Sequence, residues 1–331
     1  YRSTSNILNA ANAVIKRNAD RLGKNLWTDL GEGEPIFLYS AFNENDEARY
    51  IVENLKSWID QGNNRQDAAV LYRSNAQSRV IESALLQFDI PYRVYGGQRF
   101  FERLEIKNAL AYMRLILNCH DDVAFERVVN IPTRGIGERT VDAVREHARN
   151  ISISMWSAAK AMIVDKNLNT RSANALAAFL NLINEMTNTL EALPLSELAE
   201  NSIEMSGLIE MHRREKGERG QSRVENLEEL VGACKNFTPE SIDTPVLAQF
   251  LDQVSLEAGE RQANEDQDAV QLMTLHSAKG LEFPLVIMAG MEENLFPHKM
   301  SQNEPGRLEE ERRLAYVCLL YTSDAADDVH R

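Results

Sequence analysis

The chain has 331 residues, of which 44% are hydrophobic and 26% are charged. This composition excludes a disordered chain, because it supplies enough apolar side chains for hydrophobic cores, and the length predicts about two domains. The formal net charge of −14 argues against a protein that binds nucleic acid through a broadly basic surface. No apolar run approaches the ~18 residues of a membrane-spanning helix, so we expect no membrane partner.

The start of the chain and its cysteines indicate its context. Tyr1-Arg2-Ser3-Thr4 is neither a signal peptide nor an initiator sequence, so we expect a fragment of a longer protein. Cys119, Cys234 and Cys318 share no metal-binding spacing, so we expect no metal site. Their odd, scattered placement suits a reducing cytoplasm.

Residues 1–97 alternate between strand and helix patterns. Short apolar runs predict strands, and apolar residues at helical spacing predict helices between them. A strand-helix-strand-helix-strand order implies a parallel sheet with helices on its faces. The predicted strands are 35–39, 68–72 and 92–95, and the predicted helices are 48–59 and 80–88.

The pattern changes to helices alone over residues 98–268. Helical periodicity is clear over 106–117, 176–183 and 224–234, and Ser222 and Glu225 have the spacing of a capping box at the start of the last helix. We therefore expect an all-helical domain here.

Strands return beyond residue 268. The sequence predicts strands over 270–275 and 285–289, and the second is a continuous apolar run typical of a strand buried on both faces. The fold class is therefore α/β, with a parallel-sheet domain (1–97 and 269–317) interrupted by the helical insertion (98–268).

The negative charge is unevenly distributed. Residues 150–268 hold 10 basic and 20 acidic side chains, whereas residues 1–97 have a net charge of −1 and residues 98–149 one of +1. The global charge thus leaves room for a narrow nucleic-acid track in the near-neutral segments.

The segment 274–283, Thr-Leu-His-Ser-Ala-Lys-Gly-Leu-Glu-Phe, carries the densest set of reactive groups. It follows one predicted strand and precedes another, and the carboxyl ends of strands are where open α/β sheets bind ligands. A plain polar connecting loop is the alternative interpretation.

Several segments in chain order carry a resemblance to the UvrD/Rep-type superfamily 1 DNA helicases. Residues 274–283 resemble motif V of that family, and Tyr1-Arg2-Ser3-Thr4 resembles the end of motif IV. The other similar segments are 71–79 (LYRSNAQSR), 96–103 (GGQRFFER), 131–137 (IPTRGIG) and 309–317 (EEERRLAYV).

This resemblance implies a RecA-like, P-loop-NTPase-type sheet domain (2A) interrupted by an all-helical domain (2B). It also implies ATP and Mg²⁺ as cofactors, with the phosphate loop and the Mg²⁺ ligands in an upstream domain. No GxxxxGK[ST] motif occurs in these 331 residues.

The resemblance also implies roles at the nucleotide. Arg2 would reach the ATP phosphates, as a permanently charged guanidinium can, and is the candidate catalytic residue. Glu282 would accept hydrogen bonds from the ribose, and Gly280 would allow the backbone to approach closely. Without the resemblance, Arg2 and Glu282 would be taken as solvated surface charges.

Two groups of residues would bind DNA on the same grounds. Thr274, His276, Lys279, Arg73 and Asn75 would line a single-strand track, for which a structured polar turn is the alternative. Thr133, Arg134, Gly135, Ile136 and Gly137 precede a predicted helix, whose amino terminus attracts phosphate; they would hold duplex DNA, for which a helix-initiating turn is the alternative.

The function implied is that of the carboxy-terminal half of a bacterial, cytoplasmic, ATP-dependent 3′→5′ DNA helicase in DNA repair. Single-stranded and duplex DNA would be its partners, with repair proteins or a second helicase copy as further candidates. Two alternatives stay open: a non-enzymatic DNA- or protein-binding module, and a helicase-nuclease subunit of the RecB kind.

Residues 318–331 depart from the family pattern. The motif VI arginine, which would contact the γ-phosphate, is missing from its expected place after Val317. We expect this tail to be an artefact resembling translated adapter sequence.

Overall fold

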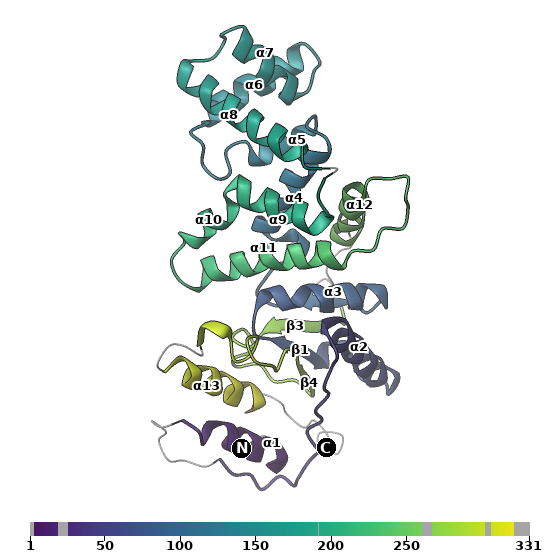
Figure 1. The fold of residues 1–331 in the computed structure, drawn as a ribbon. Helices are drawn as coiled ribbons and strands as arrows, with labels where there is room; N and C mark the ends of the chain where they lie inside the picture. Colours follow the sequence, from purple (N-terminus) through teal and green to yellow (C-terminus); the bar gives the residue numbers. More distant parts are fainter. Residues whose placement is uncertain (1–2, 19–25, 191, 260–266, 302–305, 321–331) are drawn as a thin grey trace. The chain divides into compact units, whose positions relative to one another are not determined.

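The computed structural model describes residues 3–18, 26–190, 192–259, 267–301 and 306–320. They form two compact units (Figure 1). The sheet unit comprises the described residues of Tyr1–Phe100 and Arg261–Arg331, and the helical unit those of Phe101–Glu260. The protein is therefore α/β, with one parallel sheet and many helices.

The sheet has four described strands in the order β2-β3-β1-β4, all of them parallel. Their bounds are Ala68–Tyr72 (β1), Tyr92–Val94 (β2), Val270–Thr274 (β3) and Leu285–Met288 (β4). Strand β1 is buried along its whole length, because both neighbours pair with it and helices cover both faces. These strands and the parallel sheet were predicted from the sequence, and the prediction is confirmed.

Helices cover each face of this sheet (Figure 1). On one face, α2 (Glu44–Asp60) and α3 (Ser78–Gln87) pack Leu55 and Leu85 against Val70. On the other face, α13 (Arg307–Leu320) packs Ala315 and Cys318 against Leu71 and Met273. Helix α1 (Ser5–Ile15) lies against α13. The remaining elements of the unit are the short helices η1 (Arg65–Asp67), η2 (Asn75–Gln77) and η4 (Lys299–Ser301).

The strand predicted over residues 35–39 is wrong. The segment is extended but unpaired as a strand, and its side chains are exposed, with Leu38 91% accessible. Ser5 N donates to Gly31 O before the segment, and Tyr39, the last residue of the segment, stacks on Tyr50 of α2. Apolar alternation alone does not make a strand without a neighbouring backbone to pair with.

The prediction that β4 is buried on both faces is confirmed only in part: Leu285 and Ile287 pack against one core and Val286 and Met288 against the other, but none of them is fully buried. Strand β4 lies at the edge of the described sheet and pairs only with β1 there, and each of its four residues is half-buried. A continuous apolar run in the sequence indicates that helices cover both faces of a strand. It does not indicate whether another strand pairs with each of its two edges.

The helical unit contains no strand among its described residues, as predicted. Helix α4 (Leu104–Leu117) is its central element, because it contacts five other helices and buries residues around most of its circumference. The helices after it are α5 (Asp122–Val128), α6 (Glu138–Asn150), α7 (Met155–Val164), α8 (Thr170–Thr187), α9 (Leu195–Ser206), α10 (Leu208–Arg213), α11 (Glu218–Asn236) and α12 (Val246–Gly259). The short helix η3 (Phe100–Glu102) precedes α4.

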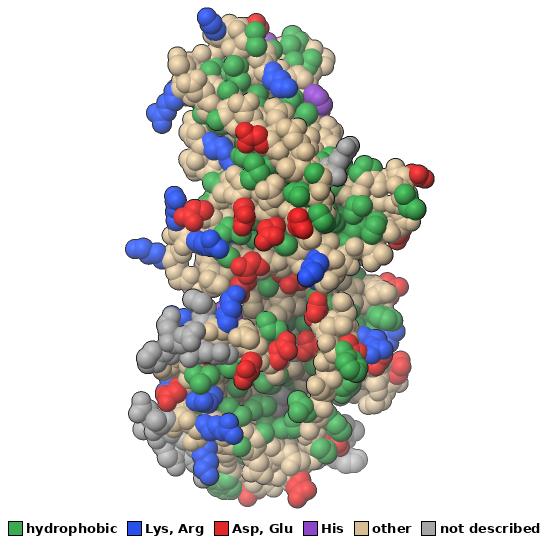
Figure 2. Space-filling view, viewed as in Figure 1, with side chains coloured by type: hydrophobic (Ala, Val, Ile, Leu, Met, Phe, Trp, Pro, Cys, Tyr) green, Lys and Arg blue, Asp and Glu red, His purple; other side chains and the backbone are tan. Residues whose placement is uncertain are grey.

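Two further features of the helical unit bear on the sequence predictions. Helix α11 begins at Glu218, so Ser222 lies inside it and is no cap; the chain has already turned at Gly217, where φ is +82°. Acidic side chains gather over α9 and α11 (Figure 2), which agrees with the excess of acidic residues counted in this segment. None of the described helices is long and apolar enough to span a membrane.

Candidate functional site

The carboxyl ends of β1 and β3 lie side by side at one edge of the sheet. The two strands are parallel neighbours, and Tyr72 at the end of β1 is in register with Thr274 at the end of β3. Leu275 N donates to Tyr72 O over 2.8 Å, which extends the pairing into the loops. The structure therefore brings together the two predicted DNA-binding segments, which are about 200 residues apart in the sequence.

Arg73, the first residue after β1, forms an ion pair with Glu311 of α13. Arg73 Nε lies 3.0 Å from both carboxylate oxygens of Glu311, and Nη2 lies 2.8 Å from Oε1. The Arg73 side chain is 17% exposed and that of Glu311 is 6% exposed. Bidentate, charge-assisted hydrogen bonds of this kind fix the plane of a guanidinium, so Arg73 is held in one orientation.

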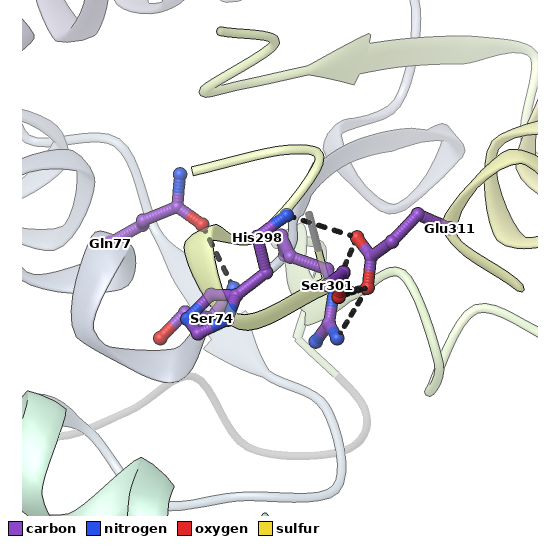
Figure 3. Close-up of polar contacts among 6 residues, drawn as sticks. Ser74, Gln77, His298, Ser301 and Glu311 are labelled. Carbon is purple, nitrogen blue, oxygen red and sulfur yellow. Dashed lines mark hydrogen bonds and ion pairs between the residues drawn. The ribbon is translucent and has the colours of Figure 1, made fainter. Parts of the chain in front are cut away.

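Glu311 has further donors around it, as Figure 3 shows. Ser301 Oγ donates to Oε1 over 3.2 Å, and His298 N lies 3.4 Å from Oε2. Burial raises the pKa of Glu311, but the hydrogen bonds and the charge of Arg73 outweigh burial and lower it below its ordinary value. The carboxylate is therefore ionised at neutral pH, and it joins the β1 loop, the loop before α13 and α13 itself.

Asn75 is placed by a turn just beyond Arg73. Ser74 N donates to Gln77 Oε1 over 2.8 Å, and Ser74 Oγ accepts from Ala76 N over 3.4 Å, which together form a capping box (Figure 3). Gln77 in turn packs over Gly290 after β4: a Cβ atom there would lie 1.9 Å from Gln77 Nε2. The turn that carries Asn75 is thus held by the capping box and by the packing of Gln77 against Gly290.

Buried and exposed residues alternate in the loop after β3. Leu275 and Ala278 are buried in the core, whereas His276, Lys279 and Gly280 are exposed. The Thr274 hydroxyl lies 2.9 Å from Ser277 Oγ and also accepts from Ser277 N. Thr274 therefore shapes the loop, and the His276 and Lys279 side chains are exposed to solvent.

The predicted nucleotide-binding residues are only partly described. Arg2 lies outside the described residues. The two residues after it are held in place, because Ser3 Oγ donates to Leu320 O over 3.0 Å and Thr4 is buried at the start of α1. Gly280 has a φ of +90°, a conformation that favours glycine, with no other atom within 4 Å of a Cβ built there. Glu282 is exposed two residues later.

The loop before α6 in the helical unit is organised by a side chain that the sequence did not single out. Asn130 Oδ1 accepts from Arg134 N over 2.7 Å and from Ile136 N over 3.2 Å. Thr133, Gly135 and Gly137 are exposed at the surface, whereas Ile136 is buried. Three of the five predicted duplex-binding residues are therefore exposed immediately before α6, and two of them are glycines.

The Arg134 guanidinium points into the protein. It donates to Pro132 O over 3.0 Å and to Ser206 O over 2.8 Å, and it lies within 6 Å of the rings of Tyr112 and Phe179. It also lines an open cavity of about 560 Å³ beside α8, together with Asn181 and Glu185. The hydrogen bonds of Arg134 therefore hold the loop to α9, and its side chain also lines this cavity.

Glu311 was missed as a functional candidate, although the sequence held a signal for it. It lies in a run of charged residues, 309–313, that resembles any solvated helix face. However, Glu311, Ala315 and Cys318 are spaced as one face of a helix, and that face is buried. A carboxylate on an otherwise apolar face indicates a buried partner of opposite charge.

Comparison with known proteins identifies the family. The UvrD-like helicase C-terminal domain family matches residues 1–320. DNA helicase II of Escherichia coli (strain K12) is 58% identical over 319 residues, and ATP-dependent DNA helicase PcrA of Bacillus subtilis (strain 168) is 41% identical over 324 residues. Each alignment covers 96% of this chain but only 44% of the relative.

The family match continues through Leu320, the end of α13, rather than stopping at residue 317 as the motifs suggested. Cys318 lies in this last turn, fully buried in the sheet unit, and burial raises the pKa of its thiol to about 12. The rest of the tail, residues 321–331, lies outside the described residues. The chain belongs to the UvrD-like helicase C-terminal domain family.

Proposed function

We propose that this chain is the carboxy-terminal half of an ATP-dependent 3′→5′ DNA helicase that moves along single-stranded DNA and unwinds duplex DNA during repair. The observation that carries the proposal is the meeting of the β1 and β3 loops at one sheet edge, where open α/β sheets bind their ligands. The family and the names of the relatives support it. We place the complete enzyme in the bacterial cytoplasm, with repair proteins or a second helicase copy as further partners.

The single-strand track, in this proposal, consists of Arg73, Asn75, Thr274, His276 and Lys279. The exposed Lys279 ammonium supplies charge for phosphate, and the exposed His276 imidazole supplies a hydrogen-bonding and stacking group. Neither group selects a particular base, which suits an enzyme that must move along any sequence.

The nucleotide would lie at the same domain. Arg2 would contact the phosphates, and Glu282 would accept from the ribose hydroxyls, for which an exposed carboxylate is suited. Glycine at position 280 keeps the backbone open to a close ligand. We assign the Mg²⁺ ligands to the amino-terminal half of the enzyme, as the resemblance to the helicase family implies.

We assign the sheet unit to domain 2A (1–97 and 269–317) and the helical unit to domain 2B (98–268). Domain 2B would hold the duplex at the loop before α6, because the exposed Gly135 and Gly137 leave room for a phosphate at the amino end of that helix. The Arg134 side chain would contribute by fixing this loop rather than by contacting phosphate directly.

Binding of a fluorescent oligothymidylate to the 331-residue chain tests the single-strand track. Lys279→Ala should weaken binding several-fold and reduce the magnitude of the slope of log K against log salt by about 0.7, the value for one phosphate contact on single-stranded DNA. Lys16→Ala removes an equal charge from an exposed site directly after α1 and should change neither quantity. Equal effects of the two substitutions would refute the track.

ATP hydrolysis by the same chain is expected to be negligible. The 331 residues contain no GxxxxGK[ST] motif, and losing an arginine finger alone costs about 10³–10⁵ in rate. DNA-stimulated phosphate release by the purified chain, measured against a no-enzyme blank, would contradict this expectation and would place a complete ATP site within these residues.

A further inference from the structure

Glu311 occupies a position to which the resemblance gives no role. It is a buried carboxylate on the apolar side of α13, and it meets Arg73 at the carboxyl edge of the sheet. Its other donors, Ser301 Oγ and His298 N, come from the loop that precedes α13. The loop after β1, 238 residues away in the sequence, and the segment before α13 therefore both contact this one side chain.

Two roles are physically distinct for such a carboxylate. It could compete with DNA phosphate for Arg73 and release the guanidinium when DNA binds, or it could hold the guanidinium in place while DNA binds beside it. Release would leave a carboxylate buried at 6% exposure without its cation, which is strongly unfavourable. The additional bonds from Ser301 and His298 would also hold the carboxylate where it is. The geometry therefore favours a Glu311 carboxylate that holds the Arg73 guanidinium in place over one that releases it to DNA phosphate.

We propose that Glu311 is a positioning residue of the single-strand track, which orients the Arg73 guanidinium toward DNA and fixes it to α13. This inference rests on the proposed function, because it takes the sheet edge as the DNA-binding surface. Glu311 acts only through Arg73 and does not touch DNA. The lowered pKa of Glu311 agrees with this role, since the support must stay ionised.

If Glu311 orients Arg73, removing its charge should change DNA affinity in the direction opposite to the one that simple electrostatics predicts. Removing a negative charge near a DNA site ordinarily strengthens binding, because phosphate is repelled less. Removing Glu311 should instead weaken binding, because Arg73 loses its orientation. Glu310 provides the matched control: it lies on the same helix with the same charge, but it is exposed.

The experiment measures oligothymidylate binding by the full chain across a salt series, with urea unfolding to verify that each variant is folded. Glu311→Gln and Arg73→Gln should each weaken binding about tenfold, the loss expected for a charge-assisted hydrogen bond, and each should reduce the salt slope by about 0.7. The double variant with Glu311→Gln and Arg73→Gln should bind oligothymidylate no more weakly than Arg73→Gln alone, because the two substitutions remove the same contact with DNA. Glu310→Gln should bind as tightly as the unchanged chain or slightly more tightly.

The possible outcomes separate this inference from the proposed function. If the unchanged chain does not bind oligothymidylate, both fail. If the unchanged chain binds but Glu311→Gln binds equally well or more tightly, only the role of Glu311 fails. Should Glu311→Gln not fold, Arg73→Lys decides the question: it retains the charge but loses the forked geometry. Weaker binding by Arg73→Lys supports orientation by Glu311, and unchanged binding overturns it.

Discussion

The ion pair between Arg73 and Glu311 couples the stability of the sheet unit to pH. The pKa of Glu311 lies below its ordinary value of 4.5 in the folded state. The ion pair therefore stabilises the fold fully above about pH 4.5, and this stabilisation is lost as the pH falls through the lower, folded-state pKa.

Urea unfolding at about pH 7 and about pH 3.5 tests this coupling. The free energy of unfolding should fall less on acidification in Glu311→Gln than in the unchanged chain, because the variant has no carboxylate to protonate at this position. Glu310→Gln, altered at an exposed site of the same helix, should follow the unchanged chain. An identical pH dependence in Glu311→Gln and the unchanged chain would contradict the assignment.

At the scale of single elements, the start of α11 depends on one glycine. A Cβ atom at Gly220 would lie 2.5 Å from His212 O and 2.7 Å from Glu215 O, and both are backbone atoms that cannot rotate away. Gly220→Ala should therefore destabilise the protein by about 1–3 kcal/mol, as overpacking does.

Gly232 supplies the control for this prediction on the same helix. Its nearest neighbour is Glu229 Oε2, 3.8 Å from a built Cβ, so an added methyl group fits. Gly232→Ala should stabilise the protein by up to ~1 kcal/mol through helix propensity. Chemical denaturation measures the free energy of unfolding of both variants. A change of the same sign in Gly220→Ala and Gly232→Ala would contradict the packing argument.

The extended segment 35–39 gives a second prediction for a single element. Leu38 is 91% exposed, whereas Leu85 of α3 is fully buried. Leu38→Ser should therefore change the free energy of unfolding by less than ~0.5 kcal/mol, while Leu85→Ala should cost about 2–5 kcal/mol. A loss of more than 1 kcal/mol in Leu38→Ser, by urea titration, would show that the segment is packed in solution.

For the whole molecule, the distribution of charge limits how DNA can be bound. The net charge is −14, and the helical unit is rich in acidic groups, so few cations are available to phosphate. We expect the slope of log K against log salt for oligothymidylate binding to be shallow, with a magnitude of about 1–2, equivalent to two or three phosphate contacts. Fluorescence anisotropy over a salt series measures it. A slope several times steeper would indicate a broad basic surface instead of a narrow track.

The sequence determined the strands of the sheet and several of the helices. Apolar runs such as 68–72 and helical periodicity such as 106–117 depend only on neighbours along the chain. The strands β1 and β3 and the helices α3 and α4 were therefore predicted within two residues of their observed bounds, and α2 within four. The segment 35–39 failed because pairing depends on a second backbone that lies elsewhere in space.

The sequence by itself determined the family, the α/β class and the loops that carry Arg73 and His276, because these are local patterns of residues. Only the tertiary structure decided that the Arg73 guanidinium meets Glu311 and that Arg134 holds its own loop to α9. The physical reason is that an ion pair forms between whichever opposite charges folding brings within reach. Arg73 and Glu311 are 238 residues apart in the chain, a separation at which no sequence periodicity carries information about contact.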